Sequence, residues 1–260
     1  MMRTPGKFDA VKTIPSGWYD RPAVITKEPR LQHDSWQGTL WLAPDFAILH
    51  GAAGATDSHA HYAHQLMLST GAPFTAELDG IVHTAQHLLV ESLHPHAIVA
   101  APSPVLTIYA EPQRLGGAAL LAAAGSAGAP RLDSLAAALQ AQPREILADA
   151  RVQRALDQVD VLLSGKVSAA AVAEAAHLSL SQLERLFSAQ LGLPVRRLVL
   201  WRRLRRLRLA IRFILLGSTL TEAAHGAGFA DAAHFSRTMR TLFGVRADRS
   251  LRQLNVKMLD

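Results

Sequence analysis

Cysteine is missing from all 260 residues. Its absence excludes a disulfide framework, a thiolate metal site and a cysteine nucleophile, and it is compatible with a reducing compartment. The continuous apolar run of about 20 residues that a membrane span needs is also missing, as is the apolar block of a signal peptide near the start. Neither a Gly-x-Ser-x-Gly nucleophile elbow nor a phosphate-binding loop occurs. We therefore expect a soluble, cytoplasmic protein that has no membrane partner and is not an enzyme.

The formal net charge of +6 is unevenly divided along the chain. Residues 151–260 hold 18 of the 27 basic residues but 8 of the 21 acidic ones, so they carry +10 and the rest carries −4. Histidine is distributed the opposite way, with nine of the twelve before residue 100. A basic half joined to a mildly acidic half indicates a polyanion partner for the basic half only. A solvated basic surface is the alternative that charge alone leaves open.

The region from Trp36 to Glu111 consists of short apolar runs separated by turn residues. The runs occupy residues 39–42, 46–49, 65–68, 74–78, 88–90 and 105–109, with turn signals at 70–73 and 78–81. Several short strands at this spacing favour an all-β sandwich or barrel. Helical periodicity begins at 132–140 and continues beyond Pro143. We predict an α+β protein with a strand-rich domain and trailing helices at 1–145 and an all-α domain at 146–260.

An internal repeat occupies the predicted all-α domain. Five positions of a first unit recur 51 or 52 residues later, so the second unit contains one inserted residue in its turn region. In each unit a small residue lets two helices cross closely, an apolar residue follows the turn, and a glycine ends the longer helix, as a helix-turn-helix requires. The matched pairs are Ala173 and Ala224, Leu178 and Phe229, Leu183 and Phe235, Phe187 and Met239, and Gly192 and Gly244.

Polar residues mark the expected starts of these helices, because their side chains can accept hydrogen bonds from the first backbone N–H groups. The expected N-caps, in chain order, are Ser168, then Ser179 or Ser181, then Thr219 or Thr221, and Asp231.

The turn positions of the two units are His177 and Gly228, where positive φ is commonly needed. Glycine adopts positive φ freely, and histidine adopts it at a higher cost.

A long helix is expected to start at Pro194 and to connect the two units. Its apolar stripe would hold the units in fixed relation, and its arginines would face DNA phosphates. The stripe is Leu198, Trp201, Leu204, Leu207, Ile211 and Ile214, and the arginines are Arg196, Arg197, Arg202, Arg203, Arg205, Arg206, Arg208 and Arg212.

Three motifs in this region resemble those of one family. Residues 220–244, LTEAAHGAGFADAAHFSRTMRTLFG, closely resemble the signature of AraC/XylS-type transcription regulators. Residues 178–187, LSLSQLERLF, resemble the first unit of that family, and residues 201–207, WRRLRRL, its connecting helix. Order, spacing and linker all agree over residues 150–250. One departure follows Gly244, where VRADR replaces the usual Pro-Ser/Thr pair.

The resemblance implies that two recognition helices enter successive major-groove segments of double-stranded promoter DNA. Gln and Arg side chains can read adenine and guanine bidentately, and Ala can meet a thymine methyl group. Phosphate contacts would position the protein without specifying sequence. The expected base-edge contacts are Ser181, Gln182, Arg185, Ser188, Ala232, Ala233, His234 and Arg237, and the expected phosphate contacts are Arg196, Arg197, Arg240 and Thr241.

The N-terminal half carries a second motif, DSHAHYAHQLML at residues 57–68. Two histidines at i and i+2 on a strand would share a face, and a third from another strand could complete a metal site. The pattern resembles the cupin barrel, with His59 and His61 as its histidine pair, Gln65 where glutamate is usual, and His96 as the later histidine. His64 could substitute for the missing carboxylate only if the strand bends.

Three interpretations of this motif remain open: a small-molecule effector pocket inside a cupin-like barrel, a divalent metal site at His59, His61 and His96, or hydrogen-bonded histidines that fill the interior. The leading prediction for the whole chain is a sequence-specific DNA-binding regulator that responds to an effector and needs no cofactor. The alternative is a metal-dependent cupin enzyme or metal sensor fused to a DNA-binding domain. A third possibility is a DNA-binding adaptor whose barrel only forms a homodimer.

Overall fold

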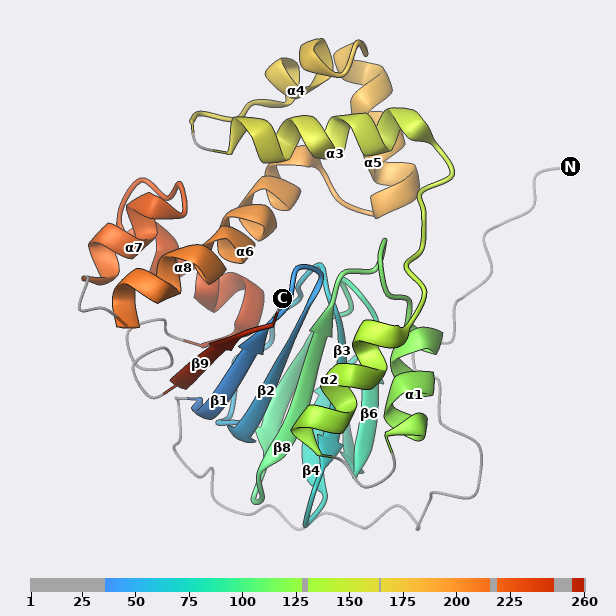
Figure 1. The fold of residues 1–260 in the computed structure, drawn as a ribbon, viewed down its shortest axis with the longest axis vertical. Coiled ribbons are helices and arrows are strands. Elements are labelled where there is room, and N and C mark those ends of the chain that lie inside the picture. The colour runs from blue at the N-terminus through green and yellow to red at the C-terminus, as the bar shows by residue number, and fades with distance from the viewer. Residues whose placement is uncertain (1–35, 128–130, 164, 216–218, 246–253, 260) are drawn as a thin grey trace, which may run out of the picture.

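A computed structural model describes residues 36–127, 131–163, 165–215, 219–245 and 254–259, and the side chains of these residues except 207–215. The strands form one part of the molecule and most helices another (Figure 1). The strands are β1 (Gln37–Leu42), β2 (Phe46–Ala52), β3 (His64–Ser69), β4 (Phe74–Leu78), β5 (Ile81–Ala85), β6 (His87–Val90), β7 (His96–Ala100), β8 (Val105–Ala110) and β9 (Leu254–Met258). The helices are α1 (Gly117–Ser126), α2 (Leu132–Ala141), α3 (Ala150–Leu162), α4 (Ala169–Ala175), α5 (Leu180–Leu191), α6 (Val195–Leu215), α7 (Leu220–Gly226) and α8 (Ala232–Phe243).

The strands build two sheets, in the orders β6-β3-β8-β2-β1-β9 and β5-β4-β7. Met67 of β3, Phe74 of β4 and Ile98 of β7 belong to one buried cluster, so the two sheets face each other across a shared core. The predicted α+β architecture is confirmed, with one difference from the expected barrel. The strands of the described residues remain in two separate sheets and do not close into one.

Helices α1 and α2 cover the other face of the six-stranded sheet (Figure 1). Leu66 and Leu68 of β3 pack there against Leu120 of α1 and Leu139 of α2. Because side chains alternate along a strand and both faces of β3 are covered, five of its six residues are buried. The helix predicted at 132–140 is confirmed as α2.

Three tight turns adopt the expected backbone. Asp79 (φ 52°) and Gly80 (φ 75°) form the two-residue loop between β4 and β5, as the turn signal at 78–81 predicted. In the helical part, His177 (φ 57°) and Gly228 (φ 87°) occupy the two turns in left-handed conformation. Both predictions of positive φ are therefore confirmed.

The two helix-turn-helix units form as predicted, α4 with α5 and α7 with α8. The inserted residue of the second unit is Ala230, because Gly228 and Phe229 match the first unit at an offset of 51, whereas Asp231, the N-cap of α8, matches Ser179 at 52. Four side chains cap the helices of the two units by accepting a backbone hydrogen bond: Ser168, Ser179, Thr219 and Asp231.

None of the helices in the described part of the chain is long and apolar enough to span a membrane.

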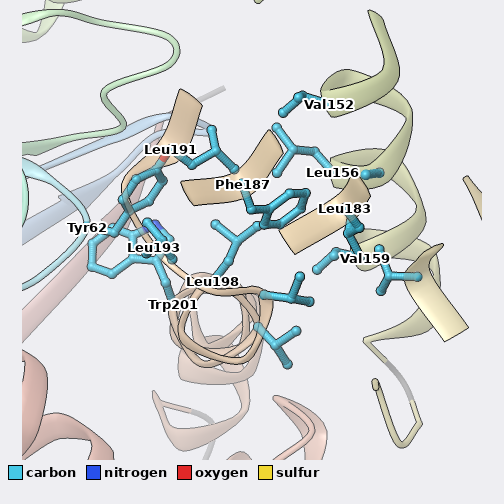
Figure 2. Close-up of a cluster of buried hydrophobic side chains, with 14 of the residues drawn as sticks. Tyr62, Val152, Leu156, Val159, Leu183, Phe187, Leu191, Leu193, Leu198 and Trp201 are labelled. Carbon is cyan, nitrogen blue, oxygen red and sulfur yellow. The ribbon is translucent and has the colours of Figure 1, made fainter. Parts of the chain in front are cut away.

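The two units pack in different surroundings. Figure 2 shows Leu183 and Phe187 of α5 turned toward Leu156 of α3, with Trp201 of α6 and Tyr62 of the strand-rich part at the edge of the same cluster. This first core is mostly helical. The second core is shared with the sheet, because residues of α7 and α8 pack against β1 and β2. Its members include Phe229, Phe235, Met239, Leu40 and Leu49.

Strand β9 was not predicted, and it lies within the region expected to be all-helical. It pairs in parallel with β1 and forms one edge of the six-stranded sheet. The chain therefore leaves the sheet after β8, builds the helices, and returns to the sheet. Residues 1–35 and most of the segment that departs from the family pattern lie outside the described residues; Val245 is buried.

Candidate DNA interface and histidine cluster

Helix α5 buries one face and exposes the other. Leu183 and Phe187 are buried in the first core, while Ser181, Arg185 and Ser188 are exposed, as a recognition helix requires. The predicted contact Gln182 is also exposed, and its side chain takes part in capping the start of α5. Its side-chain oxygen accepts a hydrogen bond from the Ser179 backbone N–H at 2.9 Å, which leaves the amide N–H groups available to a base.

Helix α8 presents a similar exposed strip. Ala233, Arg237 and Thr241 are exposed, and Ala232 and His234 are half-buried. The helix is anchored by Asp231, whose carboxylate accepts a hydrogen bond from the His234 backbone N–H at 2.6 Å. The structure thus places the predicted base contacts of the second unit on one accessible helix.

The predicted phosphate contacts fall into two groups. Arg196 and Arg197 are exposed in the first turn of α6. Arg240 is also exposed, but its guanidinium lies 2.9 Å from the carboxylate of Asp57, which belongs to the strand-rich part. A phosphate that binds Arg240 must therefore compete with Asp57.

Three arginines of α6 that were expected to face phosphates are only partly exposed and make contacts within the protein. Arg202 pairs with Asp160 of α3 at 3.1 Å, and Arg203 donates to the backbone oxygen of Gly165 at 3.1 Å. Arg205 pairs with Glu111. These guanidinium groups hold the helices to each other and to the strand-rich part. Arg208 and Arg212 lie outside the described side chains.

Glu111, which directly follows β8, joins the strand-rich part to α6 through several polar contacts. Its side chain is 3 % exposed. It accepts hydrogen bonds from Trp201 Nε1 at 3.0 Å, from Gln113 Nε2 at 2.8 Å and from Arg205, and Arg202 lies 3.7 Å away. Burial lowers the pKa of Arg205, and the carboxylate of Glu111 opposes that shift. Sequence reasoning missed this residue, and the one available signal was an acidic side chain at the end of a buried strand.

The structure brings His59, His61 and His96 together, with ligand atoms all within 4.8 Å of one another. All three side chains are buried. His59 and His61 lie in the loop before β3 and not on a strand, which corrects the expected geometry. They still converge on β7, because His59 and His96 exchange two backbone hydrogen bonds of 2.9 Å.

Burial favours the neutral form of the three histidines, and in that form they share one tautomer. Burial, His96 and His61 lower the pKa of His59 to about 3, and burial and His96 lower that of His61 to about 4. Each Nδ1 lies within 3.1 Å of a backbone oxygen and must donate to it. Each Nε2 is then an unprotonated acceptor, the form in which an imidazole binds a metal ion.

Gln65 bridges two of these nitrogens. Its side-chain amide lies 2.9 Å from His61 Nε2 and 3.0 Å from His96 Nε2. Since an amide flip exchanges its oxygen and nitrogen, the N–H groups can donate to both histidines, and the oxygen can turn toward a cation instead. His64 is not part of the cluster; its Nδ1 accepts from the Ser92 N–H at 3.1 Å.

Two cavities lie in this part of the molecule, one beside the histidine cluster and one beside Glu111 and Arg205. One of about 10 Å³ lies beside His59 and Gln65, which is room for about one water molecule. A larger one of about 130 Å³ lies between the six-stranded sheet and helices α6 and α8. Its walls are mainly apolar, and Asp45, Glu111 and Arg205 supply its charged groups. The apolar walls include Trp36, Leu40, Phe46, Trp201, Leu204, Met239 and Phe243.

Comparison with known proteins agrees with this arrangement. Residues 172–253 match a helix-turn-helix domain family. The fold is similar to that of an apo single-substitution variant of ToxT from Vibrio cholerae, with 10% identity over 81% of this chain and 98% of that chain and a TM-score of 0.51. An AraC-type regulator from Chromobacterium violaceum is 25% identical over 40% of this chain and 91% of that chain, with a TM-score of 0.37.

A structure of wild-type ToxT with a bound unsaturated fatty acid is 10% identical over 81% of this chain and 95% of that chain, with a TM-score of 0.49. No curated protein sequence matches the chain. The matched domain, the two helix-turn-helix units and the shared fold lead to one assignment. The chain is a DNA-binding transcription regulator that carries a helix-turn-helix domain at residues 172–253.

Proposed function

We propose that this regulator binds promoter DNA in response to a small-molecule effector held in the larger cavity. The position of that cavity carries the proposal, because its walls come from both the sheet and the DNA-binding helices. A ligand that touches both parts binds one relative arrangement better than another, and so shifts the population of the DNA-competent state. The 10 Å³ beside the histidines is too small for such a molecule.

The walls indicate the chemistry of the effector. Aromatic and aliphatic side chains surround most of the space, so the body of the ligand should be apolar. Arg205 and Glu111 stand together at its charged side. An apolar molecule with one anionic group could pair with Arg205 and weaken the contact with Glu111.

For DNA, we propose that the exposed strips of α5 and α8 each enter a major groove, with Arg185 and Arg237 as the main base readers. Both side chains are exposed on helices whose opposite faces are buried. Arg196 and Arg197 would bind phosphates beside them. The homodimer and the cytoplasmic location remain predictions.

A cavity-filling variant tests the effector site. Ala43, which lines the cavity and is buried, can be changed to phenylalanine. We expect 8-anilinonaphthalene-1-sulfonate, an apolar anion, to bind the wild-type protein saturably, with a fluorescence gain that falls several-fold in Ala43→Phe. Ala137→Phe, on the exposed side of α2, adds the same ring elsewhere and should bind the dye as the wild type does. Equal dye binding by all three proteins would exclude the cavity as the site.

A divalent transition metal ion at His59, His61 and His96 is a second candidate for the sensed ligand. The matching tautomers and the ligand nitrogens within 4.8 Å of one another favour it. When bound, the ion would take the three Nε2 lone pairs and the Gln65 oxygen as ligands. We propose it as a ligand to be sensed and not as part of a catalytic centre.

Substitution of Gln65 by glutamate should raise the affinity for Zn²⁺ by about tenfold or more, because a carboxylate is a stronger ligand than a carboxamide. His96→Ala should abolish binding, and His83→Ala, on β5, should leave it unchanged. The measurement is Zn²⁺ titration by calorimetry on the full chain. Indistinguishable titrations for the wild type and His96→Ala would count against a metal at this cluster.

A further inference from the structure

The two recognition helices end in the same backbone conformation and beside related loops. Helix α5 ends at Gly192 (φ 71°) and α8 at Gly244 (φ 67°), both left-handed. One loop, residues 53–63, joins β2 to β3 and carries His59 and His61. The other, residues 91–95, joins β6 to β7 and leads into His96. We call these two segments the histidine loops.

The first histidine loop holds the end of α8. The backbone N–H of Asp57 donates to the Gly244 carbonyl oxygen at 3.1 Å, and the Asp57 carboxylate pairs with Arg240 at 2.9 Å. The packing is so close that a Cβ atom on Gly244 would overlap the Asp57 carbonyl oxygen and lie 2.8 Å from His59 Nδ1. The His61 ring lies 5.5 Å from that of Phe243, centroid to centroid. This end of α8 is therefore fixed by several contacts.

The second histidine loop meets the end of α5. Leu93 packs against the buried cluster that contains Leu191 and Leu193, and its Cδ1 atom would lie 3.2 Å from a Cβ atom on Gly192. Leu93 has φ 65°, an uncommon value for a bulky residue that persists only where the surroundings hold it. The leucine side chain thus reaches the helix end from a strained backbone.

The two loops are bonded to each other. The Leu93 N–H donates to the His61 carbonyl oxygen at 2.8 Å, and His59 and His96 exchange two backbone hydrogen bonds of 2.9 Å. Direct contacts consequently run without a break from Gly192 through Leu93, the histidine loops and Asp57 to Gly244. The two hydrogen-bonded loops of the strand-rich part therefore touch the ends of both recognition helices.

We propose that Asp57 and Leu93 are positioning residues that set the relative placement of α5 and α8, and thereby the spacing between the two DNA elements that the protein prefers. This inference rests on the proposed function, in which both helices read bases. One inserted base pair moves the second element by about 3.4 Å and rotates it by roughly 35° about the DNA axis. Two helices held at their ends by two bonded loops should reject such a change.

The test measures affinity for DNA in which one or two base pairs are added between the elements. The elements are located first, by selecting a binding site with the wild-type full chain and comparing its footprint with those of Arg185→Ala and Arg237→Ala. Gly244→Ala forces the Asp57 loop away from α8, and Gly80→Ala is its matched control, since Gly80 has φ 75° but open space around it. The double variant Asp57→Ala with Leu93→Gly removes the ion pair with Arg240 and the leucine side chain beside Gly192 without adding atoms, and it keeps the backbone bond from residue 57 to Gly244.

We expect two added base pairs to weaken binding by the wild type and Gly80→Ala at least about tenfold, in line with the loss of well-placed base contacts. In Gly244→Ala and the double variant the penalty should fall to about threefold or less. Should Gly244→Ala not fold, the double variant decides. A full spacing penalty in folded variants would overturn the positioning role alone. A wild-type footprint without two separable elements would instead overturn the proposed two-helix contact, and the positioning role with it.

Discussion

Replacing Glu111 by glutamine should lower the free energy of unfolding by about 3 kcal/mol, because it removes the only carboxylate that contacts both Arg205 and Arg202 in the described structure. The two guanidinium groups are 30 % and 12 % exposed, so water can replace only part of the lost interaction. The amide could still accept from Trp201, which makes the change a test of charge more than of shape. Breaking a buried ion pair costs more than the pair contributes, since Arg205 stays largely buried without its carboxylate partner, while Arg202 keeps Asp160.

The measurement is urea-induced unfolding followed by tryptophan fluorescence. Asp133→Asn is the control, because it removes an exposed carboxylate from the first turn of α2 and should change stability by less than about 0.5 kcal/mol. We also expect Glu111→Gln to loosen the contact between the sheet and α6, which would appear as faster proteolysis of the helical part. A loss below about 1 kcal/mol would mean that Arg202 and Arg205 do not depend on Glu111.

Substituting Arg185 or Arg237 by alanine should each remove about 1–3 kcal/mol of discrimination between the preferred and random DNA sequences. The reason is that a guanidinium fork reads guanine through two hydrogen bonds, whereas alanine has no donor. Affinity for random DNA should change much less, because phosphate contacts dominate it. By contrast, Arg196→Ala or Arg197→Ala should weaken both kinds of binding and reduce the dependence of log affinity on log salt by about one.

Arg131→Ala is the charge-matched control, since Arg131 is exposed before α2 in the strand-rich part. It removes one positive charge far along the chain from either recognition helix and should leave sequence preference intact. Mobility shifts with the selected site and a scrambled site, at several salt concentrations, separate these effects. Preserved discrimination in both Arg185→Ala and Arg237→Ala would reassign base reading to other residues.

Local features of the helical part could be predicted because each depends on a few neighbouring residues. Ser168 and Asp231 cap helices through backbone groups within three residues, and Gly228 takes positive φ because it lacks a side chain. The apolar spacing in α5 and α8 determined which faces would be buried. For the same reason, the exposed strips that we assign to DNA could be located from the sequence.

Contacts between distant segments could not be predicted in the same way. The arginines of α6 look alike in the sequence, yet Arg202 and Arg205 turn inward because Glu111, some 90 residues earlier, provides a buried partner. The spacing of His59 and His61 predicts that both lie on a strand, whereas they lie in a loop that a β-bridge between His59 and His96 holds against β7. Such pairings depend on how distant segments pack against each other, and this packing cannot be derived from a single sequence.

The parallel pairing of β9 with β1 has a mechanical consequence. Because the sheet holds the chain on both sides of the DNA-binding helices, these helices form a closed loop anchored at two points. A segment that is tethered at one end can move through a large volume. A second tether keeps the helices close to the sheet, so the effective concentration of one surface at the other stays high. Separation of the two parts would require strand β9 to peel away from β1. Signals between effector and DNA should therefore travel as small tilts of docked helices, and not as release of a free domain.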